Sequence, residues 1–171
     1  IAARQVYTPR WAHCDDNHAW VEVFVDGEWH FLGACEPEEV LDTGWFSGPA
    51  NRAILIHTRN FSDYVKESNE EYLGKEGALY YFNHTDFYGR TKLVKILVKD
   101  ENGKPAAGAH IAVEILNMAE FFPAAVMIAD ADGEVRMTLG LGDIRVRAFD
   151  GIRRAEAMMR IEEEDSLELV L

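Results

Sequence analysis

The chain has 171 residues, is 48% hydrophobic and carries a formal net charge of −13, with 30 acidic against 17 basic side chains. This composition supports a folded core and is too apolar for disorder, and the length fits one medium domain or two small ones. The acidic balance argues against nucleic acid and anionic membrane as partners, and the apolar runs fall well short of the ~20 residues of a membrane span.

The first strand is expected in the opening sequence IAARQVYTP, which has no Met and no entry signal before it. We therefore expect the chain to be a fragment of a longer protein, and the absence of a secretory signal says little about the compartment. Cys14 and Cys35 are too few for a disulfide framework. The localisation stays open, with the cell envelope or secretion favoured for the parent protein.

Residues 17–38, NHAWVEVFVDGEWHFLGACEPE, predict a β-hairpin with a two-residue turn at Asp26–Gly27. Counting outward from this turn pairs the two strands residue by residue and ends with His18 opposite Cys35. Alternate residues of each strand share a face, because the side-chain period of a strand is two. The hairpin therefore has two faces that can be compared directly.

The two faces of the predicted hairpin differ in chemistry. We expect the core side to be the valine face, with Ala19, Val21, Val23 and Val25. The second face carries aromatic and ionisable side chains, namely His18, Trp20, Glu22, Phe24, Trp29 and Phe31. A solvent-facing surface does not require these residue types, so the second face is a candidate functional surface.

Two further segments complete the first half of the chain. Residues 52–61 alternate like an ordinary strand, with a substrate contact by Arg52 or His57 as the alternative. Residues 62–75 favour a polar helix or loop, which Gly74 would end.

From residue 91 onward the sequence consists of short alternating runs separated by turn signals. Asn102–Gly103 and Asp132–Gly133 are typical hairpin turns, and strands at this spacing predict an antiparallel sandwich. All four Trp and five of the six His lie before this point. We therefore divide the chain into residues 1–88 and residues 91–171.

Two local clusters offer alternative chemistry within the first half. The loop HCDDNH, residues 13–18, gathers potential zinc ligands, but no second ligand pair follows at a recognised spacing, so a polar loop is favoured over a metal site. Cys35 opposite His18 would form a thiol–imidazole dyad, although a small buried cysteine is the simpler interpretation. The sequence indicates no cofactor and no metal.

The hairpin and the strand before it resemble the transglutaminase-like superfamily of cysteine acyl-transfer enzymes. The resemblance covers about residues 1–50 and rests on the arginine of IAARQVYTP, on His-x-Trp in HAWVEV and on the tryptophan of GEWHFLG. It implies a papain-like α+β core, here mainly its antiparallel-sheet half, and a reaction on peptide or protein amides through a thioester. Hydrolysis is favoured over crosslinking, because crosslinking requires a dedicated amine site.

The resemblance also implies roles for individual residues. A thiol attacks an amide carbonyl as the thiolate, and a neighbouring imidazole accepts its proton and later protonates the leaving amine. His18 would be that imidazole. Trp20 and Trp29 would line the substrate cleft and exclude water.

The sequence departs from the family pattern at two points. The nucleophilic cysteine of the family lies upstream of the region that matches, so residues 1–171 are expected to lack it. The acid that orients the histidine would fall at Gly33, and Glu36 is our substitute for it, provided that the strand breaks near Cys35. Glu22 shares the face of His18 but lies about 13 Å along the strand, too far to orient the ring directly.

Residues 91–171 resemble the carboxypeptidase-regulatory-like, prealbumin-type β-sandwich through VKDENGKPAAGAHIAVEIL and ADADGEVRMTLGLG. Such domains are generally accessory, for spacing or for contact with a partner or sugar. We expect a packing and tethering domain, because no residue here has catalytic spacing.

The patterns predict a mainly β fold, and the transglutaminase-like resemblance implies a fragment of a cysteine acyltransferase or peptidase, with His18 and Glu36 as catalytic residues and Trp20 and Trp29 at the substrate. The expected partner is a peptide or protein substrate, without nucleic acid or membrane insertion, and the oligomeric state is open. The alternative function is a catalytically inactive domain that uses the same aromatic cleft, or the sandwich, for adhesion to protein or carbohydrate.

Overall fold

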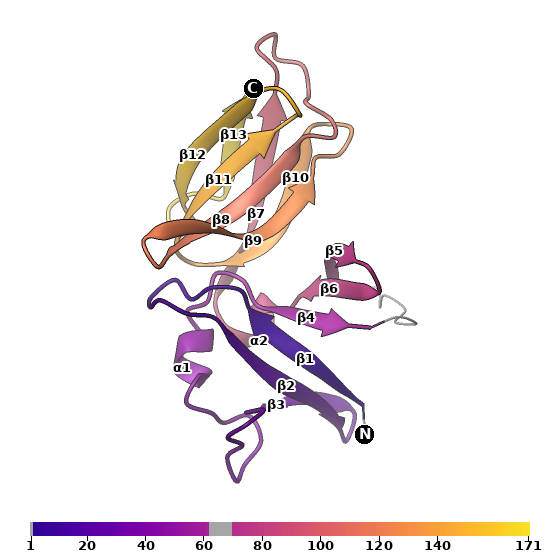
Figure 1. Cartoon of the computed structure of the whole chain (residues 1–171), viewed down its shortest axis with the longest axis vertical. Coiled ribbons are helices and arrows are strands. Elements are labelled where there is room, and N and C mark those ends of the chain that lie inside the picture. Colours follow the sequence, from indigo (N-terminus) through magenta and orange to yellow (C-terminus); the bar gives the residue numbers. More distant parts are fainter. Residues whose placement is uncertain (1, 62–69) are drawn as a thin grey trace.

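The computed structural model describes residues 2–61 and 70–171, which form a mostly antiparallel β structure with two short helices. This result confirms the mainly β fold expected from the sequence. Figure 1 shows one sheet in the N-terminal half and a two-layer sandwich in the C-terminal half. No helix in these described ranges is both long and apolar enough to cross a membrane.

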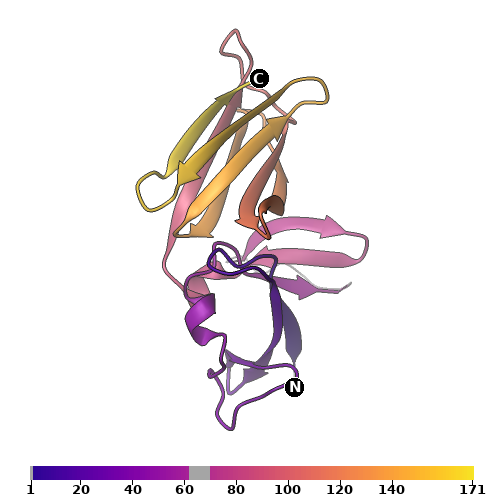
Figure 2. The same cartoon turned by 60° about the vertical axis from the view of Figure 1, so that its left-hand side comes forward.

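The N-terminal half forms one six-stranded antiparallel sheet in the order β3-β2-β1-β4-β6-β5. Its strands are β1 (Ala3–Thr8), β2 (His18–Val25), β3 (Glu28–Leu32), β4 (His57–Asn60), β5 (Glu71–Glu76) and β6 (Leu79–Asn83). The two helices, α1 (Ser47–Ala50) and α2 (Thr85–Tyr88), are single turns beside this sheet (Figures 1 and 2).

The β2–β3 hairpin has the predicted turn and register. Asp26 and Gly27 both have positive φ, 52° and 93°, as a two-residue hairpin turn of this twist requires. Phe24 pairs with Trp29, but the ladder ends where Val21 pairs with Leu32. The expected pairing of His18 with Cys35 is therefore wrong, and His18 pairs with Thr8 of β1 instead.

The more buried face of this hairpin is the aromatic face. Trp20 and Glu22 are 0% exposed, whereas the valines at 21, 23 and 25 are only partly buried. The expectation that the valine face is the core side is therefore wrong. The reason is that the chain after the hairpin covers the aromatic face, where Phe46, Ile56 and Tyr88 complete a compact core with Trp20.

The segment predicted as a polar helix or loop at residues 62–75 has a strand in its last part. Its first part, residues 62–69, lies outside the described residues. Residues 71–75 belong to β5, so the helix prediction is wrong there. Gly74 does not end a helix but lies at a bulge, where the register between β5 and β6 shifts.

Residues 91–171 form the expected sandwich from two sheets, β10-β7-β13 and β12-β11-β8-β9. The strands are β7 (Thr91–Lys99), β8 (His110–Asn117), β9 (Glu120–Ile128), β10 (Glu134–Gly140), β11 (Asp143–Phe149), β12 (Arg154–Arg160) and β13 (Ser166–Val170). Their pairing is antiparallel except that β13 runs parallel to β7. The turns at Asn102–Gly103 and Asp132–Gly133 carry the chain between the two sheets and do not join paired strands.

The two halves share a hydrophobic core. Ile54, Leu55 and Leu73 are buried in the same cluster as the interior of the sandwich. The Gly140 amide donates to the Ile54 carbonyl at 2.8 Å, and a Cβ atom at Gly140 would lie only 1.9 Å from the Ala53 carbonyl oxygen. The close backbone approach therefore requires glycine at this junction.

We predict that residues 91–171 fold alone and that residues 1–88 do not. The sandwich has its own two-layer core, whereas the first half would lose the partner of Ile54 and Leu55 and would expose apolar surface. Thermal unfolding of each piece checks this, with the whole chain as the control. A cooperative transition of residues 1–88 as a monomer would contradict the prediction.

His57 on β4 is a buried ionisable group near the junction. It is 5% exposed and lies edge-on to the rings of Tyr7 and Tyr81. Burial lowers the pKa of its imidazole from 6.5 to about 4, assisted by the charge of Arg59 and opposed by a backbone hydrogen bond at Thr58. The folded state therefore holds His57 neutral, while the unfolded state protonates it below pH 6.5.

We predict that this difference makes the protein less stable as the pH falls from 6.5 toward 4. Between about pH 7 and about pH 5 the loss attributable to His57 is about 2 kcal/mol, since each pKa unit corresponds to ~1.4 kcal/mol. Urea unfolding of the wild type and of His57→Phe at both pH values measures it, because the other histidines are common to both proteins. An equal loss in both proteins would contradict the prediction.

Candidate functional site

His18 begins β2 and faces the buried side of the sheet, inside a box of aromatic rings. Its ring stacks on Trp20 with 5.7 Å between centroids and lies 4.6 Å from Trp45. Phe46 and Trp11 complete the box at 5.1 Å and 6.2 Å. Aromatic walls of this kind hold an imidazole in one orientation and remove water from around it.

Within residues 2–61 and 70–171, one nitrogen of the His18 imidazole is buried without a hydrogen-bond partner, as is Nδ1 of His57. The Nε2 atom is buried and has no hydrogen-bond partner among the residues that the structure describes. Burial lowers the pKa of His18 below its ordinary value of 6.5, and the carboxylates of Glu36 and Asp16 offset part of this effect. The ring is therefore neutral at neutral pH, with a nitrogen available for a proton.

Glu36 lies near His18 but hydrogen-bonds elsewhere. Its Oε1 atom accepts a hydrogen bond of 3.0 Å from the indole Nε1 of Trp45, the ring nearest to the imidazole. In residues 2–61 and 70–171 no hydrogen bond joins Glu36 to His18, and the two interact only through the carboxylate charge. Glu36 is thus placed to hold the aromatic wall of the site.

The strand break that the Glu36 hypothesis requires is present, but it begins at Gly33. β3 ends at Leu32, and the chain then folds back on itself. A Cβ atom at Gly33 would lie 2.5 Å from the backbone carbonyl oxygen of Glu36. An aspartate at this position, as in the family pattern, would therefore displace the turn that carries Glu36.

Beneath His18, the carboxylate of Glu22 organises a buried polar cluster. The Arg4 Nε donates to Glu22 Oε2 at 2.7 Å, and the Tyr88 hydroxyl donates to Oε1. The indole Nε1 of Trp20 donates to the Tyr88 oxygen at 2.8 Å. His84 Nε2 lies 3.3 Å from Glu22 Oε1, and a proton on that nitrogen would complete the set.

The electrostatics of this cluster keep Glu22 ionised. Burial alone raises the pKa of its carboxyl, but the hydrogen bond and charge of His84, the charge of Arg4 and the hydrogen bond from Tyr88 outweigh it, so the pKa ends below 4.5. Burial and the Glu22 charge raise the pKa of Tyr88, which stays protonated. Trp20 therefore has a fixed acceptor for its indole N–H and a fixed position under His18.

The other predicted site residues do not gather around His18. The ring of Trp29 lies at the far end of the hairpin, 4.0 Å below the Arg4 guanidinium, where it covers the Glu22 cluster. Cys14 and Cys35 are both free and exposed. His57 faces the opposite side of the sheet, because it pairs with Tyr7, whereas His18 pairs with Thr8.

The loop that places Trp11 beside His18 is held by the sandwich. Asn117, at the end of β8, is 3% exposed and donates from Nδ2 to the carbonyls of Trp11 at 2.9 Å and Cys14 at 2.8 Å. The Met118 amide donates to Asp15 Oδ1 at 2.5 Å. The turn after β8 therefore clamps the HCDDNH loop from outside the sheet.

Trp11, Trp45 and Phe46 were not predicted from the sequence as site residues. All three lie in irregular segments, where no periodicity reports which side chains converge. The concentration of all four Trp in the first half was the available signal, and three of them contact the His18 ring. The fourth, Trp29, does not.

The HCDDNH loop does not form a metal site with its neighbours. No group of three or more His, Cys, Asp or Glu side chains arranged to hold a metal occurs within residues 2–61 and 70–171. No family model matches the sequence, and a search of the curated proteins found no match.

We predict that Asn117→Ala loosens the HCDDNH loop. The backbone carbonyls of Trp11 and Cys14 lose their buried partner, which should destabilise the protein by about 2 kcal/mol and raise amide exchange in the loop. Hydrogen exchange and urea unfolding measure both effects. The exposed turn variant Asn102→Ala is the control, and loop exchange that is equal in the two variants would argue against the clamp.

Proposed function

We propose that this chain carries the acid–base histidine of a cysteine acyl-transfer enzyme that acts on peptide or protein amide bonds. The observation that supports this most strongly is the neutral imidazole of His18, with its buried and unpartnered Nε2 inside an aromatic box. An imidazole held only for structure normally uses its ring nitrogens in hydrogen bonds. A general base needs a free nitrogen of this kind for the incoming proton.

In the proposed reaction, His18 Nε2 accepts the proton of a thiol that another segment of the full-length protein supplies. The thiolate attacks the amide carbonyl, the C–N bond breaks, and the imidazolium returns its proton to the leaving amine. A thioester remains. Water then attacks the thioester carbonyl while His18 accepts a water proton, and the carboxylic acid and thiol are released.

The lowered pKa of His18 fits the first of these steps. A protonated imidazole cannot accept a proton, and burial of the ring among Trp11, Trp20 and Trp45 favours the neutral form. The same rings cover part of the imidazole and reduce its contact with water. Both effects come from one structural feature, the aromatic box.

Orientation of the histidine differs from the usual triad in this proposal. A triad acid accepts a hydrogen bond from the second ring nitrogen. Here the Glu36 carboxylate accepts from Trp45, which lies against the ring, and Trp20 is fixed by Tyr88. Glu36 and Tyr88 are therefore positioning residues that act through tryptophans.

The second candidate function is a binding module, and one observation favours it. Trp45 is 56% exposed and presents its ring at the mouth of the site, where Glu36 holds its indole nitrogen. An exposed aromatic platform with a fixed edge is a common means of binding an apolar group. This function requires the aromatic rings but not the His18 nitrogen.

Activity of the full-length product of the gene, assayed on a peptide-amide library, tests the proposal. We expect His18→Ala to lower kcat/KM by about a hundredfold or more, and Glu36→Gln by about tenfold with a changed pH profile. His30→Ala, at a partly buried histidine on the valine face of the same hairpin, should retain activity.

Two results would contradict the acid–base role of His18. Full activity in His18→Ala would reject the acid–base role, and peptide binding lost in Trp45→Ala but kept in His18→Ala would favour the binding module. We expect residues 1–171 alone to be inactive. Turnover by this chain that Cys35→Ala abolishes would instead assign the thiol to Cys35, against the exposed position that it occupies.

A further inference from the structure

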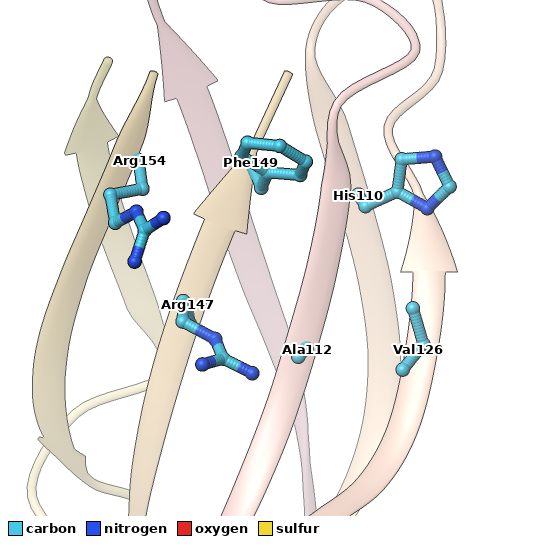
Figure 3. A pocket seen from close by; sticks show the side chains of 6 residues that line it. All are labelled: His110, Ala112, Val126, Arg147, Phe149 and Arg154. Atoms are coloured by element: carbon cyan, nitrogen blue, oxygen red, sulfur yellow. The ribbon is translucent and has the colours of Figure 1, made fainter. Parts of the chain in front are cut away.

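A groove crosses the outer face of the sheet β12-β11-β8-β9, on the sandwich and away from His18. It encloses about 450 Å³ and is lined by His110, Ala112, Val126, Arg147, Phe149 and Arg154. Figure 3 shows the two arginines, Phe149 and His110 around a hollow above the small side chain of Ala112. The proposed acyl-transfer function makes no use of this surface.

The register of the sheet explains why these side chains converge. Arg154, Phe149, His110 and Ile128 pair in one row across the four strands, and Glu156, Arg147, Ala112 and Val126 pair in the next. Paired residues point to the same face of a sheet. Alanine in the middle of the second row leaves the space that the longer side chains around it enclose.

The charge of the groove is opposite to that of the chain. Its lining holds two guanidinium groups and no carboxylate, whereas the whole chain has a net charge of −13. Arg147 is oriented by an ion pair of 2.7 Å with Glu114, whose side chain is 1% exposed. Arg145 also pairs with Glu114 at 2.7 Å, so this carboxylate is already neutralised.

Arg154 differs from its neighbours because it has no ion-pair partner in the described part of the chain, residues 2–61 and 70–171. Unpaired arginine beside oriented arginine forms a binding position for a carboxylate, which accepts two N–H groups at once. The rim is apolar as well, with Val126 53%, Phe149 40% and Ile128 62% exposed.

We propose that this groove binds an acidic peptide segment of a partner protein, with a Glu or Asp carboxylate between Arg147 and Arg154 and apolar neighbours against Phe149 and Val126. Charge complementarity selects the carboxylate, and the exposed apolar rim selects a peptide over a free acid. A polyanion such as nucleic acid would meet repulsion from the rest of a strongly acidic protein.

Fluorescence anisotropy of the whole chain with labelled hexapeptides tests this proposal. The probes are an N-acetylated, C-amidated peptide of alternating Val and Glu and its counterparts with Gln or Lys in place of Glu. We expect the Glu peptide to bind, the other two to bind at least tenfold more weakly, and affinity to fall with salt.

Three variants connect the binding to the groove. Arg154→Glu reverses the unpaired charge, and Ala112→Leu fills the floor without changing charge, so each should weaken the Glu peptide by roughly tenfold or more. Arg136→Glu is the control, since it makes the same charge change at an exposed position of the opposite sheet, and it should leave binding unchanged.

The proposal is overturned by several results of the same experiment. These are no binding of the Glu peptide at about 1 mM, equal binding of the Gln peptide, or unchanged binding in both groove variants. Tighter binding of single-stranded DNA or of phosphatidylglycerol vesicles than of the Glu peptide would also overturn it, because a polyanion would then be the preferred ligand.

Discussion

The buried ion pair between Arg4 and Glu22 is the constraint on which the candidate site depends. Glu22 is 0% exposed and stays ionised only because Arg4, His84 and Tyr88 surround it. Removing one partner of a buried pair typically costs about 3–5 kcal/mol, since the other charge is left uncompensated. Through the Tyr88 hydroxyl, the same carboxylate fixes the indole of Trp20, on which the imidazole of His18 stacks. The cluster around Glu22 thus sets the position of His18, which it does not contact.

The sandwich contributes to this site from a distance in sequence. Asn117 closes the loop that bears Trp11, and the core of the sandwich buries Ile54 and Leu55, which lie between α1 and β4. The second half of the chain is therefore more than a tether, because the aromatic box around His18 has one wall that depends on it. Its outer face carries the groove lined by Arg147 and Arg154, for which we propose a separate role.

The features predicted correctly from the sequence are those that depend on neighbouring residues alone. The Asp26–Gly27 turn fixed the hairpin register because two positive φ angles permit only that twist. The register failed beyond Leu32, where the backbone of Glu36 returns against Gly33, a contact that no strand pattern reports. The buried face was mistaken because alternation marks two faces without saying which later segment covers either. The clamp by Asn117 and the walls from Trp11 and Trp45 come from irregular segments far apart in the chain, beyond the reach of periodicity.

NMR titration of the His18 imidazole in the wild type and in Glu36→Gln tests most directly whether His18 is a neutral base held by aromatic rings. We expect a wild-type pKa below 6.5, because burial dominates, and a still lower pKa in the variant, because the Glu36 charge opposes that effect. A hydrogen-bonded orienting carboxylate would instead raise the wild-type pKa above 6.5, and Glu36→Gln would then lower it by a larger amount. A wild-type pKa above 6.5, or a pKa that Glu36→Gln leaves unchanged, would contradict the assignment of His18 as a neutral base held by aromatic rings.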